Sequence, residues 1–296
     1  MSKLLKAAFF RYTHSMVFGI CLLLTAVFAG LFSRWIHYAS ELSARWFLAE
    51  IIVFATVICL TVGTETAGCV KNKLVCGFSR TKIFFSELIV ANVVVLFFFA
   101  IFAVFSFVVN IRLLGNTPLK MILQCLLGFG CMAVMLATAF VTVSCIFSRP
   151  AAAAAGCMIT VVVLFASTAL VLDLLAEPEF FKGRYRVDGG EWQDYIEENE
   201  RYVDSPLREV LIFYKNANPF GVLSDYEDVM VPWLYEDEAL ASAMDATANT
   251  IGNDFLRREI SPDEQRFLDR APIRMVAPVP VLILAGWLIF RRKTFS

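Results

Sequence analysis

The chain has 296 residues, of which 58% are hydrophobic and 18% charged, and its formal net charge is -1. An average soluble domain is about 45–50% apolar and about 25% charged, so this composition excludes an ordinary soluble protein and predicts an integral membrane protein. The charge is unevenly distributed, because 22 of the 27 acidic residues lie within residues 177–269. Two parts of the chain are therefore expected to face different surroundings, a membrane and water.

The chain begins with an amphipathic segment, residues 1–15, which is expected to lie in the membrane interface as a helix. The Lys and Arg side chains of this helix fall mostly on one side, and the other side carries Leu4, Leu5, Ala8, Phe9 and Tyr12. The apolar run at 16–33 is just long enough to cross a ~30 Å hydrocarbon core at ~1.5 Å per residue. A basic start before an apolar run also occurs in signal peptides, but no small-residue cleavage site follows it.

Further apolar runs predict membrane spans at residues 46–63, 88–109, 121–147, 151–172 and 273–290. The last of these spans is expected to be interrupted by Pro278 and Pro280. Glu50 is the only acid well inside a predicted span, and an intramembrane carboxylate is by default a functional candidate. Because Glu50 is close to a helix end, it could instead reach the headgroup region or pair with Arg45.

A polar insertion at residues 174–272 separates the last two spans and is expected to form a large α+β extracellular domain. Asp188-Gly189 is a hairpin signal within the strand-like alternation of residues 185–192. The second predicted helix of the domain has Ser205 as its cap, and the helices are predicted over 192–202, 206–217, 234–249 and from 261 into the membrane. The predicted fold class is therefore an all-α membrane protein with six transmembrane helices, an N-terminal interfacial helix, and this domain between helices five and six.

The basic residues predict how the spans are oriented. With six spans both chain ends share one side, and that side carries eleven basic residues, four of them in the loop at 64–87. The short loops on the other side carry four. The positive-inside rule therefore places both termini, the tail at 291–296 and the loop at 64–87 in the cytoplasm, and the acidic domain outside.

The eight cysteines all fall in predicted spans or in the loop at 64–87. A large exterior domain without a disulfide indicates a bacterial cell membrane rather than a secretory pathway. Cys69 and Cys76 have no histidine nearby, so they are expected to be buried thiols, and no metal site is expected. The motifs HExxH, GxSxG and GxxxxGK[ST] are absent, and His14 and His37 are predicted on opposite sides of the membrane, so the chain is not expected to be an enzyme.

Residues 70–82 read VKNKLVCGFSRTK and precede a Phe-rich span. This segment resembles the loop between the second and third helices of bacterial type-2 ABC exporter permeases, which often has a basic residue and Asn-Lys, then Gly, Ser and Arg. The end of the chain, GWLIFRRK, is similar to the usual end of those proteins. The run Asn218-Pro219-Phe220-Gly221, predicted to end the helix over 206–217, is similar to an element of their exterior region.

The resemblance implies a permease subunit that pairs with a second permease subunit and with a separate ABC ATPase subunit. That ATPase would bind ATP and magnesium, and this chain would bind no cofactor. The loop would carry a coupling helix seated on the ATPase, and the coupling role falls on Glu65, Lys71, Asn72, Lys73, Gly77, Arg80 and Lys82. Basic anchors that meet anionic lipid would explain the charge of this loop, but not Gly77 or its compactness.

The expected function is ATP-driven export of a hydrophobic or peptide substrate, with antimicrobial peptides or toxins as the class that the family implies. Membrane lipid is an expected partner and nucleic acid is not. A substrate pathway is expected along Glu50, Phe97, Phe98 and Phe99, although lipid contact or helix packing explains the Phe residues equally well. The alternative function is a membrane sensor or scaffold without transport, whose acidic extracellular domain binds a ligand or a protein.

Overall fold

The computed structural model describes residues 2–34, 70–109, 119–147, 150–186, 192–234 and 262–292. The predicted span at 46–63, with Glu50, lies outside the described residues, as do Glu65 and nearly all of the helix predicted over 234–249. The described helices are α1 (Ser2–Thr13), α2 (Met16–Arg34), α4 (Val70–Val75), α5 (Arg80–Val109), α6 (Leu119–Ile146), α7 (Pro150–Ala176), α8 (Leu207–Ala217), α9 (Pro219–Leu234), α11 (Pro262–Val276) and α12 (Val279–Arg292). Strands β1 (Phe180–Arg186) and β2 (Trp192–Glu198) form a two-stranded sheet.

The chain is mostly helical, and several of its helices are long and apolar enough to cross a membrane. Within the described residues these are Arg80–Phe105, Ile122–Ile146, Ala151–Ala176 and Gln265–Arg292. Helices α1 and α2 are bent by 59° relative to each other and would make a fifth span if they cross together. Helices α2, α6 and α7 coincide to within a few residues with the apolar runs at 16–33, 121–147 and 151–172.

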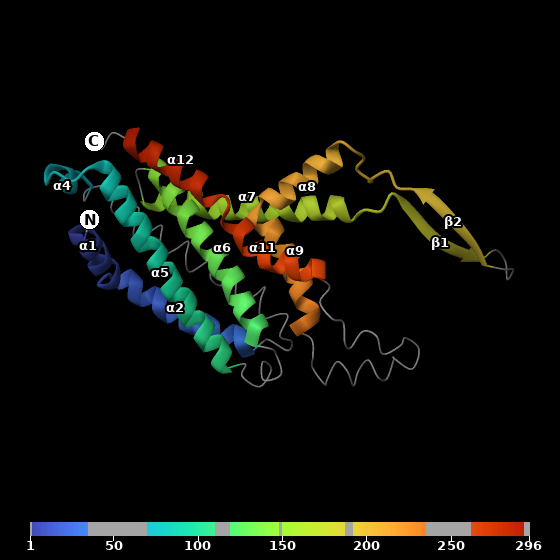
Figure 1. Cartoon of the computed structure of the whole chain (residues 1–296), viewed down its shortest axis with the longest axis horizontal. Coiled ribbons are helices and arrows are strands. Elements are labelled where there is room, and N and C mark those ends of the chain that lie inside the picture. The colour runs from blue at the N-terminus through green and yellow to red at the C-terminus, as the bar shows by residue number, and fades with distance from the viewer. Residues whose placement is uncertain are drawn as a thin grey trace.

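Helices α5 and α6 pack against each other in the middle of the bundle, with α2 against α5 and α12 against α6 (Figure 1). Their shared core is apolar and rich in Phe, and Phe98 and Phe140 within it are 1% and 0% exposed. Helix α7 packs on α6 and then continues away from the bundle toward the β1–β2 hairpin, with α8 and α9 returning beside it (Figure 1). The insertion therefore contacts the bundle through α8 and α9, which pack on α7, and through α11, which packs on α6.

The N-terminus, α4 and the C-terminal end of α12 lie together at one end of the bundle, whereas the hairpin lies beyond the far end of α7 (Figure 1). The basic residues predicted that both chain ends and the loop at 64–87 share one side of the membrane. The described part of that loop does lie at the same end of the bundle as the two chain ends. We call this end, made by α1, α4, the start of α5 and the end of α12, the basal end.

Two paired strands lie on either side of the predicted hairpin turn, and one of them was predicted as a helix. Asp188-Gly189, the predicted turn itself, lies outside the described residues. Strands β1 and β2 pair antiparallel, with Phe180 opposite Glu198 and Arg186 opposite Trp192. The helix predicted over 192–202 is therefore wrong, because cross-strand pairing with β1 favours an extended chain that local pattern does not reveal. The cap predicted at Ser205 is also wrong, since Pro206 itself is the N-cap of α8 and no side chain caps the helix.

Two helix boundaries determine the shape of the basal end and of the last span. Helix α5 begins at Arg80, well before the predicted start of the third span at residue 88, so the last part of the loop at 64–87 extends this span as helix. The last span is broken between α11 and α12, as predicted. Pro278 and Pro280 lie at this break and have no backbone N–H to donate, so a continuous ladder of helical hydrogen bonds cannot pass through it.

Candidate functional site

The coupling segment predicted from the sequence forms a short helix, a tight turn and the start of a long helix. Gly77 follows α4 with a φ of 82°, a left-handed conformation that glycine adopts without steric cost. The N–H of Phe78 donates to the carbonyl of Lys73 at 3.1 Å, and the N–H of Gly77 donates to that of Leu74 at 3.0 Å. This pair of bonds is a Schellman motif, which satisfies the last carbonyls of α4 and ends the helix.

Helix α5 starts directly after this turn. The Ser79 hydroxyl accepts a long hydrogen bond from the N–H of Lys82 at 3.4 Å, and the Ser79 carbonyl accepts one from Ile83 at 3.1 Å. Serine at this position satisfies an N–H that the first turn of a helix leaves without a partner. The turn from Cys76 to Ser79 is therefore defined at both ends, and the geometry between α4 and α5 is compact.

A buried acid holds three elements together at the basal end. Glu87 on α5 is only 5% exposed. Its Oε1 atom lies 2.8 Å from Nζ of Lys73 on α4 and 3.4 Å from Nη2 of Arg11 on α1. A carboxylate buried without a cation would carry a large desolvation penalty, which the two cations offset. We call Arg11, Lys73 and Glu87 the basal ion cluster.

Apolar contacts surround the basal ion cluster and strengthen it by excluding water. Helix α1 buries Leu4, Ala8 and Tyr12, which recur every four residues on one face. This face packs against α5, where Ile83 is fully buried. Phe9 was predicted on the apolar side but is 47% exposed, so the buried stripe is narrower than predicted. The amphipathic segment predicted at 1–15 is therefore a helix whose apolar stripe is covered by protein.

A second set of contacts joins the start of α5 to the end of α12. Arg80 donates from Nη1 to the carbonyl oxygen of Arg291 at 2.7 Å, and Trp287 donates from Nε1 to Oγ1 of Thr81 at 3.1 Å. The guanidinium of Arg291 lies 5.4 Å from the centre of the Trp287 ring. A cation that binds the final carbonyls of a helix also interacts favourably with the helix dipole.

Helix α12 approaches α5 and α6 closely because it has glycine at the contact. A Cβ atom on Gly286 would lie 2.8 Å from Oγ1 of Thr142 and 3.1 Å from Cζ of Phe84. Thr142 also lies 3.0 Å from the carbonyl oxygen of Leu282, to which its hydroxyl donates across the helix interface. The last span is thereby seated on the two central helices directly beside the basal end.

The predicted coupling residues divide into two groups. Asn72, Gly77 and Lys82 are exposed, whereas Lys73 and Arg80 are used inside the chain, in the ion pair with Glu87 and the bond to Arg291. The backbone of Lys71 lies in α4, and Glu65 lies outside the described residues. The exposed surface of α4 and the following turn also includes two residues that were not predicted to have a coupling role. Val75 is 87% exposed. Cys76 is exposed as well, so its prediction as a buried thiol is wrong.

Sequence reasoning missed Glu87 and Arg11 as site residues. A signal for Glu87 was present, because it is a single acid between a basic segment and an apolar run. The sequence does not show which cations pair with Glu87, because one of them, Arg11, is 76 positions away along the chain.

The three phenylalanines of the predicted substrate pathway do not share one surface. Phe98 is 1% exposed and packs on Phe18 with ring centres 5.1 Å apart, and Phe99 is 8% exposed, with the edge of its ring close to Gly130. Phe97 is 49% exposed. Packing of α5 against α2 and α6 accounts for Phe98 and Phe99.

The run Asn218-Pro219-Phe220-Gly221 makes the corner between α8 and α9. Asn218 accepts the N–H of Phe220 at 3.1 Å and donates to the carbonyl of Leu164 on α7 at 3.2 Å. The Phe220 ring packs edge-on against Phe165, also on α7. A Cβ on Gly221 would lie 2.3 Å from the carbonyl oxygen of Lys215, so the corner requires glycine. The run therefore ends α8, as predicted, and attaches the insertion to α7.

Metal chemistry has no visible basis in the part of the chain that the structure describes, where no group of three or more His, Cys, Asp and Glu side chains is placed to hold an ion. Comparison with known proteins adds no assignment, because no family model, no curated protein and no solved structure matches this chain.

Proposed function

We propose that the chain is the permease subunit of a bacterial ABC exporter of the type-2 class, embedded in the cell membrane with both termini in the cytoplasm. A separate ATPase subunit would dock on the exposed surface of α4, of the following turn and of the start of α5, which includes Asn72, Val75, Cys76 and Lys82. A second permease subunit would complete the transport pathway. The cargo would be a hydrophobic or peptide molecule.

The basal ion cluster is the observation that supports this proposal most. Helix α4 has six residues, too few to be stable in isolation. The ion pair between Lys73 and Glu87 attaches it to a helix of 30 residues that is long enough to cross a membrane. Movement of α4 by a bound ATPase would therefore be transmitted directly to α5, and through Arg11 to α1.

The contacts of Arg80 extend the same argument to the last span. Because Arg80 binds the carbonyl of Arg291, displacement of the start of α5 would also move the end of α12. Both ends of the chain would then respond to one docking event. A sensor that only binds ligands through its exterior domain does not require a rigid connection of this kind at the basal end.

The test is purification of the permease from its native membrane together with any P-loop ATPase that associates with it, followed by reconstitution of the pair in proteoliposomes. Val75→Glu places a charge at the centre of the proposed docking surface without touching the basal ion cluster. We expect it to weaken ATPase binding at least about tenfold, the loss typical of a central interface residue, and to abolish export of a fluorescent hydrophobic peptide.

The matched control is Ile196→Glu, which makes the same kind of change at an exposed apolar residue of the hairpin. This variant should bind the ATPase as the wild type does. The proposal fails if the purified permease binds no such ATPase, or if Val75→Glu and Ile196→Glu bind it equally well.

A further inference from the structure

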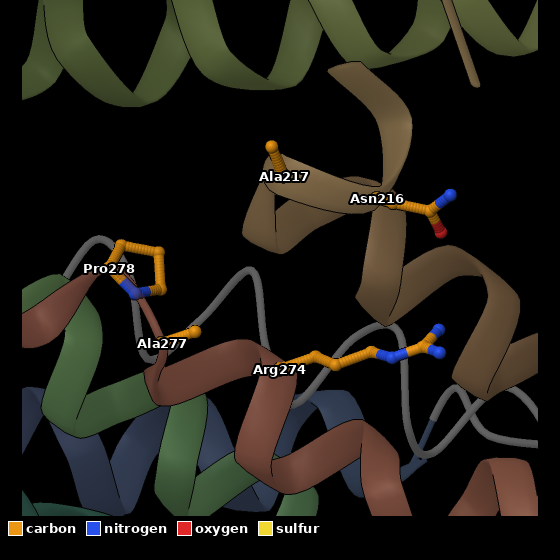
Figure 2. A pocket seen from close by; sticks show the side chains of 5 residues that line it. All are labelled: Asn216, Ala217, Arg274, Ala277 and Pro278. Atoms are coloured by element: carbon orange, nitrogen blue, oxygen red, sulfur yellow. The ribbon is translucent and has the colours of Figure 1, made fainter. Parts of the chain in front are cut away.

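A cleft lies where the end of α8 faces the break in the last span. It has a volume of about 460 Å³ and is lined by Asn216, Ala217, Arg274, Ala277 and Pro278. Figure 2 shows that the side chains of Asn216, from α8, and Arg274, from α11, extend the same way along the cleft. The cleft therefore presents one cationic group and one amide, and its other lining side chains are small or apolar.

Arg274 is the only charged group of the cleft lining, and no acid neutralises it within the described residues. Its guanidinium lies 5.8 Å from the centre of the Phe267 ring, a contact that leaves its N–H donors available. Lys215, one residue before Asn216, is already paired with Asp225. The carbonyls of the last turn of α8 repel an anion, but together they carry only about half of a negative charge. This is less than the full positive charge of Arg274.

The position of the cleft along the last span puts it near a membrane surface. Despite the break between α11 and α12, Gln265–Arg292 is one candidate membrane span. At ~1.5 Å per residue it rises about 26 Å from Arg274 to Arg291, close to the ~30 Å thickness of a hydrocarbon core. With Arg291 and Arg292 at one surface, Arg274 therefore lies near the other. Polar side chains occur around this level, since Gln124 on α6 donates to Asp269 on α11 at 3.2 Å.

An apolar stripe leads from the cleft along α12. Ala277 in the break forms part of the cleft wall, and α12 then presents Val281, Leu284 and Leu288, which are 68%, 55% and 40% exposed. Their spacing of three and four residues places them one above the other. The cationic end of this surface is at the depth of lipid headgroups, and its apolar part is at the depth of acyl chains.

We propose that this cleft binds the headgroup of an anionic phospholipid. Arg274 and the amide of Asn216 donate hydrogen bonds to the phosphate oxygens, and an acyl chain lies along Val281, Leu284 and Leu288. A guanidinium suits this role because it is permanently charged and its donors match two phosphate oxygens at once. The site is distinct from the basal end and does not depend on whether the chain exports a substrate.

The test uses the full chain in nanodiscs that contain equimolar phosphatidylglycerol and phosphatidylcholine. The protein is then released into detergent, and the phosphatidylglycerol that stays bound is counted by native mass spectrometry. We expect Arg274→Gln to retain roughly tenfold less of this lipid than the wild type, the effect of losing one charge-assisted contact. Ala277→Leu should lower retention as well, because it narrows the cleft and keeps the charge.

The matched control is Arg270→Gln, which removes the same charge from the same helix one turn away and outside the cleft lining. It should retain lipid as the wild type does, and thermal unfolding should show that all three variants fold. Equal retention by wild type and Arg274→Gln overturns the proposal, as does equal loss in Arg270→Gln. A competition experiment distinguishes lipid from free phosphate. If inorganic phosphate binds the protein in nanodiscs of phosphatidylcholine alone and prevents binding of phosphatidylglycerol that is added later, the proposal is overturned, since the ligand would then be free phosphate.

Discussion

Lys73 on α4 and Glu87 on α5 form an ion pair of 2.8 Å, and their side chains are 14% and 6% exposed. The two residues are 14 positions apart, separated by the turn at Gly77. A short helix is thus attached to a long one by a pair that water hardly reaches. An ion pair in such surroundings is screened much less by salt than a surface pair.

Replacement of Glu87 by Gln should destabilise the basal end. The substitution leaves Lys73 and Arg11 near an amide that carries no charge, and breaking a partly buried pair in this way costs on the order of 3 kcal/mol. The expected result is a lower thermal unfolding midpoint in detergent, together with faster hydrogen exchange in α4. Glu200→Gln, at an exposed acid next to the hairpin, is the matched control and should change neither. An unchanged midpoint in Glu87→Gln would show that the cluster does not stabilise the fold.

Substitution of Gly77 should depend on which residue replaces it. Gly77→Val forces a β-branched side chain into a left-handed conformation, with a penalty of roughly 1–2 kcal/mol or more. Gly77→Asn should be tolerated better, because asparagine adopts this conformation more readily. No atom lies within 4 Å of the Cβ position, so the difference arises from the backbone and not from crowding. Hydrogen exchange at residues 72–78 measures the effect, and equal exchange in both variants would contradict the assigned motif.

Gly286→Ala should separate α12 from the central helices. The added methyl group would lie 2.8 Å from Oγ1 of Thr142, and overpacking of this kind costs about 1–3 kcal/mol. Gly19→Ala is the matched control, since nothing lies within 4 Å of its Cβ position on α2. That change should be neutral or stabilising, because alanine favours helix by about 1 kcal/mol relative to glycine. The thermal unfolding midpoints of the two variants should therefore move apart, and a shared shift would argue against close packing at Gly286.

The exposed thiol of Cys76 offers a direct test of orientation and docking. In a Cys69→Ser background, a membrane-impermeant maleimide should label Cys76 in inside-out vesicles and not in intact cells. Addition of the partner ATPase should slow this labelling several-fold, because Cys76 lies on the proposed docking surface. Cys145 and Cys157 are buried and serve as internal references that stay unlabelled. Labelling in intact cells would reverse the proposed topology, and labelling unaffected by the ATPase would exclude docking at this turn.

Composition and local pattern determined the helical membrane class and most of the helix positions. A run of apolar residues long enough to cross a bilayer needs no distant partner to be recognised, so the helices α2, α6 and α7 follow from the sequence to within a few residues. The hairpin signal at Asp188-Gly189 and the break near Pro278 were equally local. Such features depend on the backbone preferences of a few neighbouring residues.

Only the tertiary structure decided which way the charged side chains of the coupling segment point. Lys73 and Arg80 appeared equivalent to Lys82 in the sequence, yet the first two bind Glu87 and the carbonyl of Arg291 while Lys82 is exposed. The partner of Arg80 is 211 positions away, so no local pattern contains it. The strand at Trp192–Glu198 has the same explanation, because hydrogen bonds from β1 determine its conformation. Local preference predicts the elements, and long-range contact selects the partner that each side chain meets.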